Sequence, residues 1–273
     1  MLGIERTDAA RRAVFNNLEV FSRLVKVPNG MFLLDRQKRG FIEMIATRVK
    51  RGMICLIRFS EGKSFLRQGK CAEAVRCFRL SSLRSLSASA YLAYMLTNGR
   101  IGVRQDLSEA EHLIRTGAQK GNSDCCALLA VYVIQGWLTH QHGVHTLIQM
   151  SVGSVFHHWA LGLENLDNLQ FQKAVTNLTK AAREGIDAAY FRLAMFFYKG
   201  ESGVVDYEKA LHLHKVAAEL GSSRSQFMIG HHYQFGKGVV VDIEEAKRWY
   251  GQAASADDPN AIAVLKRLRV RWN

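Results

Sequence analysis

The stretch that decides the fold lies at residues 233–254 and reads YQFGKGVVVDIEEAKRWYGQAA. Its second half carries small and apolar residues at relative positions 0, 3, 4, 7 and 8: Ala246, Trp249, Tyr250, Ala253 and Ala254. These offsets trace one face of an α-helix. Small residues above and below a bulky pair let a neighbouring helix approach closely. The stretch therefore predicts a helix that packs against another helix.

The same pattern recurs along the chain at a fixed period. The alanines that open it are separated by 36, 64, 36 and 36 residues: Ala74, Ala110, Ala174, Ala210 and Ala246. Such a period is typical of a repeat architecture. The longer interval contains no Lys, Arg, Asp or Glu between Cys125 and Leu163. It predicts a degenerate, largely buried repeat at residues 122–166, with helices near 124–135, 144–149 and 154–163.

Each patterned helix has the same residues in front of it. Asp106, Asp206 and Asp242 stand four residues before the alanine, where a short carboxylate caps the free N–H groups of a helix. Glu109 and Glu245 would complete capping boxes. A Gly-Val pair precedes each aspartate, which predicts a positive-φ turn with a valine packed beneath it. An earlier helix leads into each turn: residues 90–96, 189–198 and 225–235. The expected unit is two helices joined by a glycine turn and closed by a capping glycine at Gly121, Gly185 or Gly221.

Residues 197–210, FYKGESGVVDYEKA, and residues 233–254 resemble the Sel-1-like repeat, a relative of the tetratricopeptide repeat. Residues 92–121 are similar with one extra residue, and residues 61–85 match only in the second helix. The resemblance implies an all-α fold, an α/α solenoid formed as a right-handed superhelix of helix-turn-helix repeats. It also implies a scaffold for protein complexes rather than a reaction.

The repeats divide the chain into three expected parts. Residues 1–60 show no repeat and read as an N-terminal helical cap, with helices at residues 8–26 and 37–59. Residues 61–257 form the repeat solenoid. Residues 258–273 follow as an amphipathic, basic C-terminal capping helix that begins after Pro259.

Charge and cysteine content bear on partners and location. The net charge is +13, and residues 1–120 hold 22 Lys and Arg against 10 Asp and Glu. This excess predicts protein partners with an acidic surface, or, alternatively, a subunit of a ribonucleoprotein or other nucleic-acid assembly bound through residues 1–120. No apolar stretch is long enough for a membrane helix. Five cysteines without a C-x-x-C pair favour a reducing compartment, the cytoplasm. A mitochondrial matrix is the alternative, although Glu5 and Asp8 argue against a transit peptide.

The sequence offers no catalytic or cofactor-binding motif, because the acids that can be placed are expected helix caps or surface charges. The histidines between residues 140 and 158 have a spacing that could be built into a metal site: His140, His142, His145, His157 and His158. Known zinc frameworks are stricter, so histidines hydrogen-bonded within a loop are the expectation. We therefore predict a non-enzymatic adaptor without cofactor or metal.

The expected partner-binding groove is lined by residues of the first helix of each repeat that are not needed for stacking. Aligning the repeats selects six of them: Tyr91, Tyr94, Arg192, Met195, Met228 and His231. Aromatic, Met and Arg side chains are enriched at binding surfaces. The alternative is that the two tyrosines and two methionines simply fill the core.

Overall fold

The computed structural model describes residues 36–97, 100, 102–141 and 143–271, with the side chains of residues 36–50 and 269–271 left aside. These residues form helices joined by turns, with isolated bridges as the only β pairing among them. The all-α prediction is confirmed. The chain divides into two units, residues 1–51 and residues 52–273, and the second contains the repeats. The helix expected at residues 8–26 lies outside the described residues.

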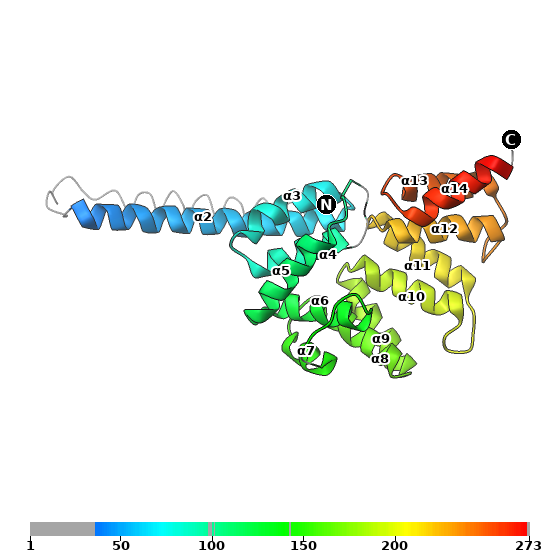
Figure 1. The fold of residues 1–273 in the computed structure, drawn as a ribbon, viewed down its shortest axis with the longest axis horizontal. Coiled ribbons are helices and arrows are strands. Elements are labelled where there is room, and N and C mark those ends of the chain that lie inside the picture. The colour runs from blue at the N-terminus through cyan, green and yellow to red at the C-terminus, as the bar shows by residue number, and fades with distance from the viewer. Residues whose placement is uncertain (1–35, 98–99, 101, 142, 272–273) are drawn as a thin grey trace. The chain divides into compact units, whose positions relative to one another are not determined.

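The helices follow one another along the chain as labelled in Figure 1. In order they are α2 (Arg36–Arg67), α3 (Cys71–Ser82), α4 (Leu86–Thr97), α5 (Leu107–Gln119), α6 (Ser123–Ile134), α7 (Val144–Met150), α8 (His157–Asp167), α9 (Phe171–Arg183), α10 (Asp187–Lys199), α11 (Tyr207–Glu219), α12 (Ser223–Phe235), α13 (Ile243–Ala254) and α14 (Pro259–Arg271). Within the described part of the chain, no helix is long and apolar enough to cross a membrane.

Successive helices pair as hairpins, namely α4 with α5, α6 with α7, α8 with α9, α10 with α11, and α12 with α13. Each hairpin also packs on the next, so the stack of helix-turn-helix repeats expected from the period is present (Figure 1). The three helices expected within residues 122–166 are α6, α7 and α8. The α/α solenoid predicted from the sequence is therefore confirmed.

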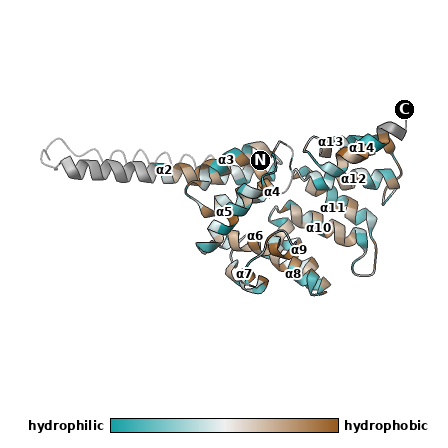
Figure 2. Cartoon of the chain, viewed as in Figure 1, coloured by the Kyte–Doolittle hydropathy of each residue, from teal (hydrophilic) through white to brown (hydrophobic). Residues whose placement is uncertain are grey.

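The small residues of the repeat pattern lie between helices, as predicted. Ala110, Ala174, Ala210 and Ala246 are fully buried, and Ala253 is as well. The repeat helices carry both hydrophobic and hydrophilic residues along their length (Figure 2). Like residues 88–97 of α4, residues 125–132 of α6 are all buried. This accords with the absence of charge noted there, because α6 packs against α4, α5, α7 and α8.

The predicted helix caps form, but the capping boxes do not. The carboxylates of Asp106, Asp206 and Asp242 each accept a hydrogen bond of 2.9 Å from the backbone N–H three residues on. The reciprocal half is missing, because the N–H of Asp106 donates to the Leu96 carbonyl and that of Asp242 donates to the Tyr233 carbonyl. These bonds tie each turn back to the preceding helix. The acids expected to complete the boxes make ion pairs instead: Glu109 with Arg79, and Glu245 with Arg248.

The turns before the caps use glycine as expected. Gly102, Gly203 and Gly238 all have positive φ, and so do the closing glycines. The valine prediction holds only in part. Val103 is buried beneath its turn, whereas Val204 is 70% exposed, so packing beneath the turn is wrong at that position.

The ends of the repeat array differ from the expected bounds. Helix α2 continues to Arg67 rather than ending near residue 59, because no proline or glycine turn interrupts the chain before Gly69, where φ is +68°. Helix α14 begins at Pro259 itself. The Asp258 carboxylate caps it by accepting bonds from the N–H groups of Asn260 and Ala261. Proline suits the first helical position because its missing N–H would have no partner there.

Candidate functional site

Two turns that are far apart in the sequence lie in contact within the unit of residues 52–273. These are the turn before α3, at Gly69, and the turn between α11 and α12, at Gly221. A Cβ on Gly69 would lie 2.5 Å from the carbonyl oxygen of Glu219, and one on Gly221 would lie 2.6 Å from the Cys71 sulfur. Both glycines also have positive φ. The backbone can therefore approach this closely only because neither residue has a side chain.

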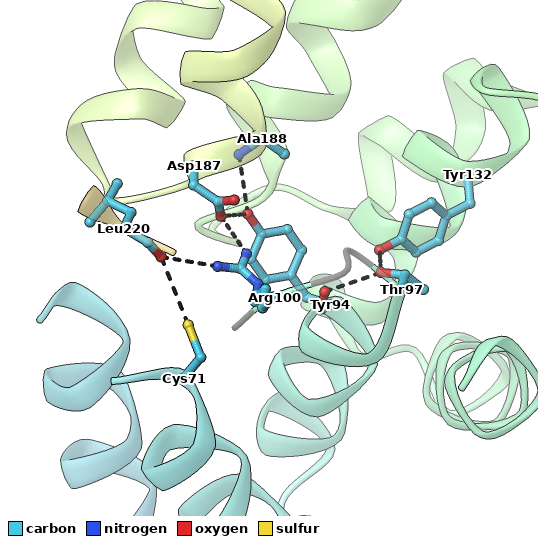
Figure 3. A network of polar contacts seen from close by, with 8 residues as sticks. All are labelled: Cys71, Tyr94, Thr97, Arg100, Tyr132, Asp187, Ala188 and Leu220. Atoms are coloured by element: carbon cyan, nitrogen blue, oxygen red, sulfur yellow. Dashed lines mark hydrogen bonds and ion pairs between the residues drawn. The ribbon is translucent and has the colours of Figure 1, made fainter. Parts of the chain in front are cut away.

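A buried polar network joins the same parts of the chain (Figure 3). Arg100, in the turn between α4 and α5, forms an ion pair with Asp187 at the start of α10 and donates a hydrogen bond of 3.3 Å to the Leu220 carbonyl. The hydroxyl of Tyr94 also donates to Asp187, and the N–H of Ala188 donates to that hydroxyl. We call Arg100, Asp187, Tyr94 and the Leu220 carbonyl the clasp. It connects the α4–α5 repeat to helices three hairpins further along the chain.

The charges of the clasp are stable because they are paired. The side chains of Arg100 and Asp187 are 0% and 4% exposed. Burial opposes the charge on Arg100, but the adjacent Asp187 carboxylate outweighs it and raises the pKa of the guanidinium. Burial, together with the charge of Asp187, raises the pKa of Tyr94 well above its ordinary value. Arg100 is therefore charged and Tyr94 neutral across the physiological range, and removing Asp187 would leave an uncompensated buried charge.

The network continues from the clasp to the wall of a surface hollow. The Thr97 hydroxyl donates to the Tyr94 carbonyl and is hydrogen-bonded to the Tyr132 hydroxyl (Figure 3). Thr97 and Tyr132 both line that hollow, which has a volume of about 440 Å³. Trp137 also lines it, so we call it the tryptophan hollow. The other lining residues are Gln105, Leu107, Glu111, Ile114, Leu138 and Arg224.

Aromatic side chains shape the tryptophan hollow. The Trp137 ring stacks on Tyr132, with an angle of 5° between the planes and 5.5 Å between the ring centroids. Trp137 remains 42% exposed, although it is large and apolar. The Arg224 guanidinium of α12 lies 5.3 Å from the centre of the Trp137 ring. The hollow thus combines apolar and aromatic side chains with the cation of Arg224, a combination typical of binding surfaces.

A second hollow, of about 400 Å³, adjoins the first because both are lined by Gln105 and Arg224. Two methionines line it, so we call it the methionine hollow. Besides the two shared residues, its lining consists of Phe191, Met195, Ser223, Phe227, Met228 and residues 256–260. Helices α10 and α12 supply its aromatic and methionine side chains, and the turn before α14 supplies Asp257 and Asp258. Methionine side chains adapt to differently shaped partners.

The predicted groove residues separate into three groups. Met195 and Met228 both line the methionine hollow. Tyr91 and Tyr94 do not line it, because they are 7% and 0% exposed. Tyr91 contacts Phe59, Phe78 and Phe156, and Tyr94 contacts Phe156 and Trp159. Their assignment to the groove is therefore wrong, and the core alternative holds for both.

Arg192 and His231 are partly buried and engaged with neighbours within the chain. Arg192 makes two hydrogen bonds of 3.0 Å to the carboxylate of Glu201. His231 is hydrogen-bonded to the Tyr198 hydroxyl at 3.2 Å. Neither residue is among those that line the methionine hollow. Their participation in partner binding stays a prediction.

Sequence reasoning missed the two residues that both hollows share, Gln105 and Arg224, and the exposed Trp137 of the tryptophan hollow. Gln105 lies in the turn before α5, Trp137 follows α6 and Arg224 lies in the first turn of α12. None of them belongs to the repeat pattern, and their meeting depends on how distant repeats pack. The one signal available was Trp137 itself, a large aromatic residue in the charge-free stretch just after a helix.

The histidine-rich stretch does not gather around one point. His145 lies 3.5 Å from a carboxylate oxygen of Glu164, and His157 is hydrogen-bonded to the Ser151 hydroxyl at 2.8 Å. His142 lies outside the described residues. Among the residues that are described, no three His, Cys, Asp or Glu side chains are grouped closely enough to hold a metal ion. All five cysteines are free and buried.

The helical hairpins and their stacking define an α-helical repeat protein. Its repeats match the family model of the Sel1 repeat at residues 86–122, 187–222 and 223–258. The chain thus contains three Sel1 repeats, and the resemblance predicted from the sequence is confirmed. Proteins with this repeat are generally scaffolds for protein–protein interaction.

Parts of this chain are similar to two curated proteins, a chitin synthase regulator and a Sel1-repeat-containing protein. The chain is 32% identical over 90 residues to the chitin synthase regulator SKT5 of Saccharomyces cerevisiae, an alignment that covers 32% of this chain and 13% of that protein. It is 27% identical over 155 residues to the Sel1-repeat-containing protein YjcO of Escherichia coli K12, covering 55% of each.

Among solved structures, a protective antigen of uropathogenic E. coli strains with an SLR fold is 25% identical, with a TM-score of 0.48, covering 74% of this chain and 45% of that one. The chain spans 13% and 55% of the lengths of the two curated relatives described above.

Proposed function

We propose that this chain is a non-enzymatic adaptor that binds a protein partner at the two adjoining hollows. The observation that carries the proposal is their position and lining. They open side by side, share Gln105 and Arg224, and expose Trp137, Met195 and Met228 around polar groups. A concave surface with aromatic, Met and Arg side chains has the composition of a protein-binding site.

The carboxylates at the hollows support an adaptor rather than an enzyme. Glu111 accepts a hydrogen bond of 2.7 Å from Arg115, and Asp258 caps α14. These two acids have structural partners within the chain, which favours binding over acid–base chemistry at the hollows. The five free thiols fit a reducing compartment, so we place the protein in the cytoplasm as part of the same proposal.

Copurification from native cells tests the proposal. Met228→Glu introduces a charge into the methionine hollow, and Met150→Glu makes the same change at an exposed position on α7 that lines neither hollow. We expect nuclease-treated extracts to yield partners with the wild type and with Met150→Glu, but not with Met228→Glu. Circular dichroism would establish that both variants are folded.

Two results would contradict this proposal. Partners that persist on Met228→Glu would mean that the hollows are not the binding surface. Loss of every partner on nuclease treatment would favour the alternative, an assembly with nucleic acid through the basic residues 1–120.

A further inference from the structure

Arg224 is a cation that lines the tryptophan hollow. Its guanidinium lies over Trp137, and none of the acids that the structure describes forms an ion pair with it. The other charged group of the hollow, Glu111, is already paired with Arg115 at 2.7 Å. The uncompensated charge at this hollow is therefore positive.

The apolar part of the same hollow is built for a bulky side chain. The Trp137 ring is stacked on Tyr132, and the fully buried Ile114 also lines the hollow. The hydroxyl of Tyr132 is hydrogen-bonded to that of Thr97, which donates in turn to the backbone carbonyl of Tyr94. A preformed aromatic surface of this kind loses little conformational entropy when it binds.

We infer that the tryptophan hollow recognises a protein segment in which a bulky apolar or aromatic side chain stands beside an acidic one. This inference rests on the proposed function and names the class of partner. The apolar side chain would stack on Trp137, and the carboxylate would pair with Arg224. Arg224 lies 5.3 Å from the Trp137 ring, and one extended residue spans about 3.3–3.6 Å. The acidic residue therefore stands one or two positions from the apolar one.

The neighbouring methionine hollow sets the direction of the segment. Its charged groups besides Arg224 are Asp257 and Asp258. These carboxylates repel an acidic side chain, so the acid lies over Arg224 and not further along. The continuation of the segment over Met195 and Met228 is apolar or basic.

A randomised peptide library displayed on phage and selected on the whole chain tests the inference. We expect enrichment of an acidic residue one or two positions from a bulky apolar residue. Trp137→Ala should weaken the selected peptides by about tenfold or more, as loss of an interface hot spot does. Val240→Ala, an exposed apolar position elsewhere, is the matched control and should leave binding unchanged.

The charge step is tested by reversing it. Arg224→Glu lies in the first turn of α12, where a carboxylate is favourable to the helix. It should weaken the selected acidic peptide by about tenfold and strengthen a synthetic version in which Lys replaces the acid. Arg76→Glu makes the same change of net charge on α3, away from the hollow, and should affect neither peptide.

The outcomes separate the two levels of the proposal. Selected peptides that need Met228 but show no acidic preference, or ignore Arg224→Glu, overturn this inference and leave the proposed function standing. Peptides indifferent to every substitution in either hollow, or no selection at all, contradict both. A dimer in solution that Trp137→Ala converts to a monomer would show that a second copy of the chain occupies the hollow, and would also overturn the inference.

Discussion

Replacing Asp187 by asparagine tests whether the clasp holds distant repeats together. The substitution keeps the shape of the side chain but removes the charge that pairs with Arg100, whose side chain is fully buried. Removing one partner of a buried ion pair costs about 3–5 kcal/mol, because the remaining charge is uncompensated. In a unit of this size 1 kcal/mol lowers the melting temperature by about 2–4 °C. We therefore expect Asp187→Asn to lower it by about 6–20 °C.

Glu244→Gln is the matched control, since it makes the same chemical change in an exposed pair. Glu244 is 76% exposed and lies 2.8 Å from Lys247. Exposed ion pairs and charges near a helix end are worth less than about 1 kcal/mol. The two variants should therefore differ clearly in thermal unfolding followed by circular dichroism.

Hydrogen exchange locates the effect. In Asp187→Asn the amides around Arg100 and Leu220 should lose protection before those of α13, because the clasp joins these two segments directly. A variant that melts within about 2 °C of the control, or that loses protection evenly along the chain, would refute the role assigned to the buried pair.

Two further predictions concern α11–α13. Ala253 is fully buried, so Ala253→Leu should lower the stability by about 1–3 kcal/mol through overpacking. Regional hydrogen exchange should show that α12–α14 lose protection first. A uniform loss of protection along the chain, or no loss, would mean that the stacking face is misplaced. Burial, with a smaller contribution from His232, lowers the pKa of His214 to about 3, below its ordinary value of 6.5. The unfolded chain then binds the proton more readily, so stability is complete above about pH 6.5 and falls by about 1.4 kcal/mol per pH unit as the pH drops towards 3. Urea titrations at several pH values should show this slope reduced in His214→Gln, and an unchanged slope would assign the acid sensitivity to other groups.

The repeats of this protein could be read from the sequence because their determinants are local. A helix face requires residues three and four apart, a cap requires Asp206 near the N–H of Lys209, and a turn requires a glycine such as Gly203. Each of these lies within a few residues, and the period of 36 residues repeats them. The hairpins, the capping aspartates and the buried alanines were therefore all predictable.

Local patterns did not predict what covers a second face of a helix. Tyr94 has the spacing of a groove residue, but Phe156 and Trp159, more than 60 positions later in the sequence, pack over it. Glu245, which was expected to complete a capping box, likewise forms an ion pair with Arg248. The N–H of Asp242 that it would have bonded already donates to a carbonyl of the preceding helix.

The sequence by itself determined the helices, their turns and the order in which they stack. The tertiary structure decided which distant repeats meet. Arg100 and Asp187 are 87 positions apart, and Gln105 and Arg224 come to line the same hollows only when the repeats close on one another. Such contacts depend on the small rotation between successive repeats, which accumulates along the stack and leaves no periodic signature in the residues that finally touch.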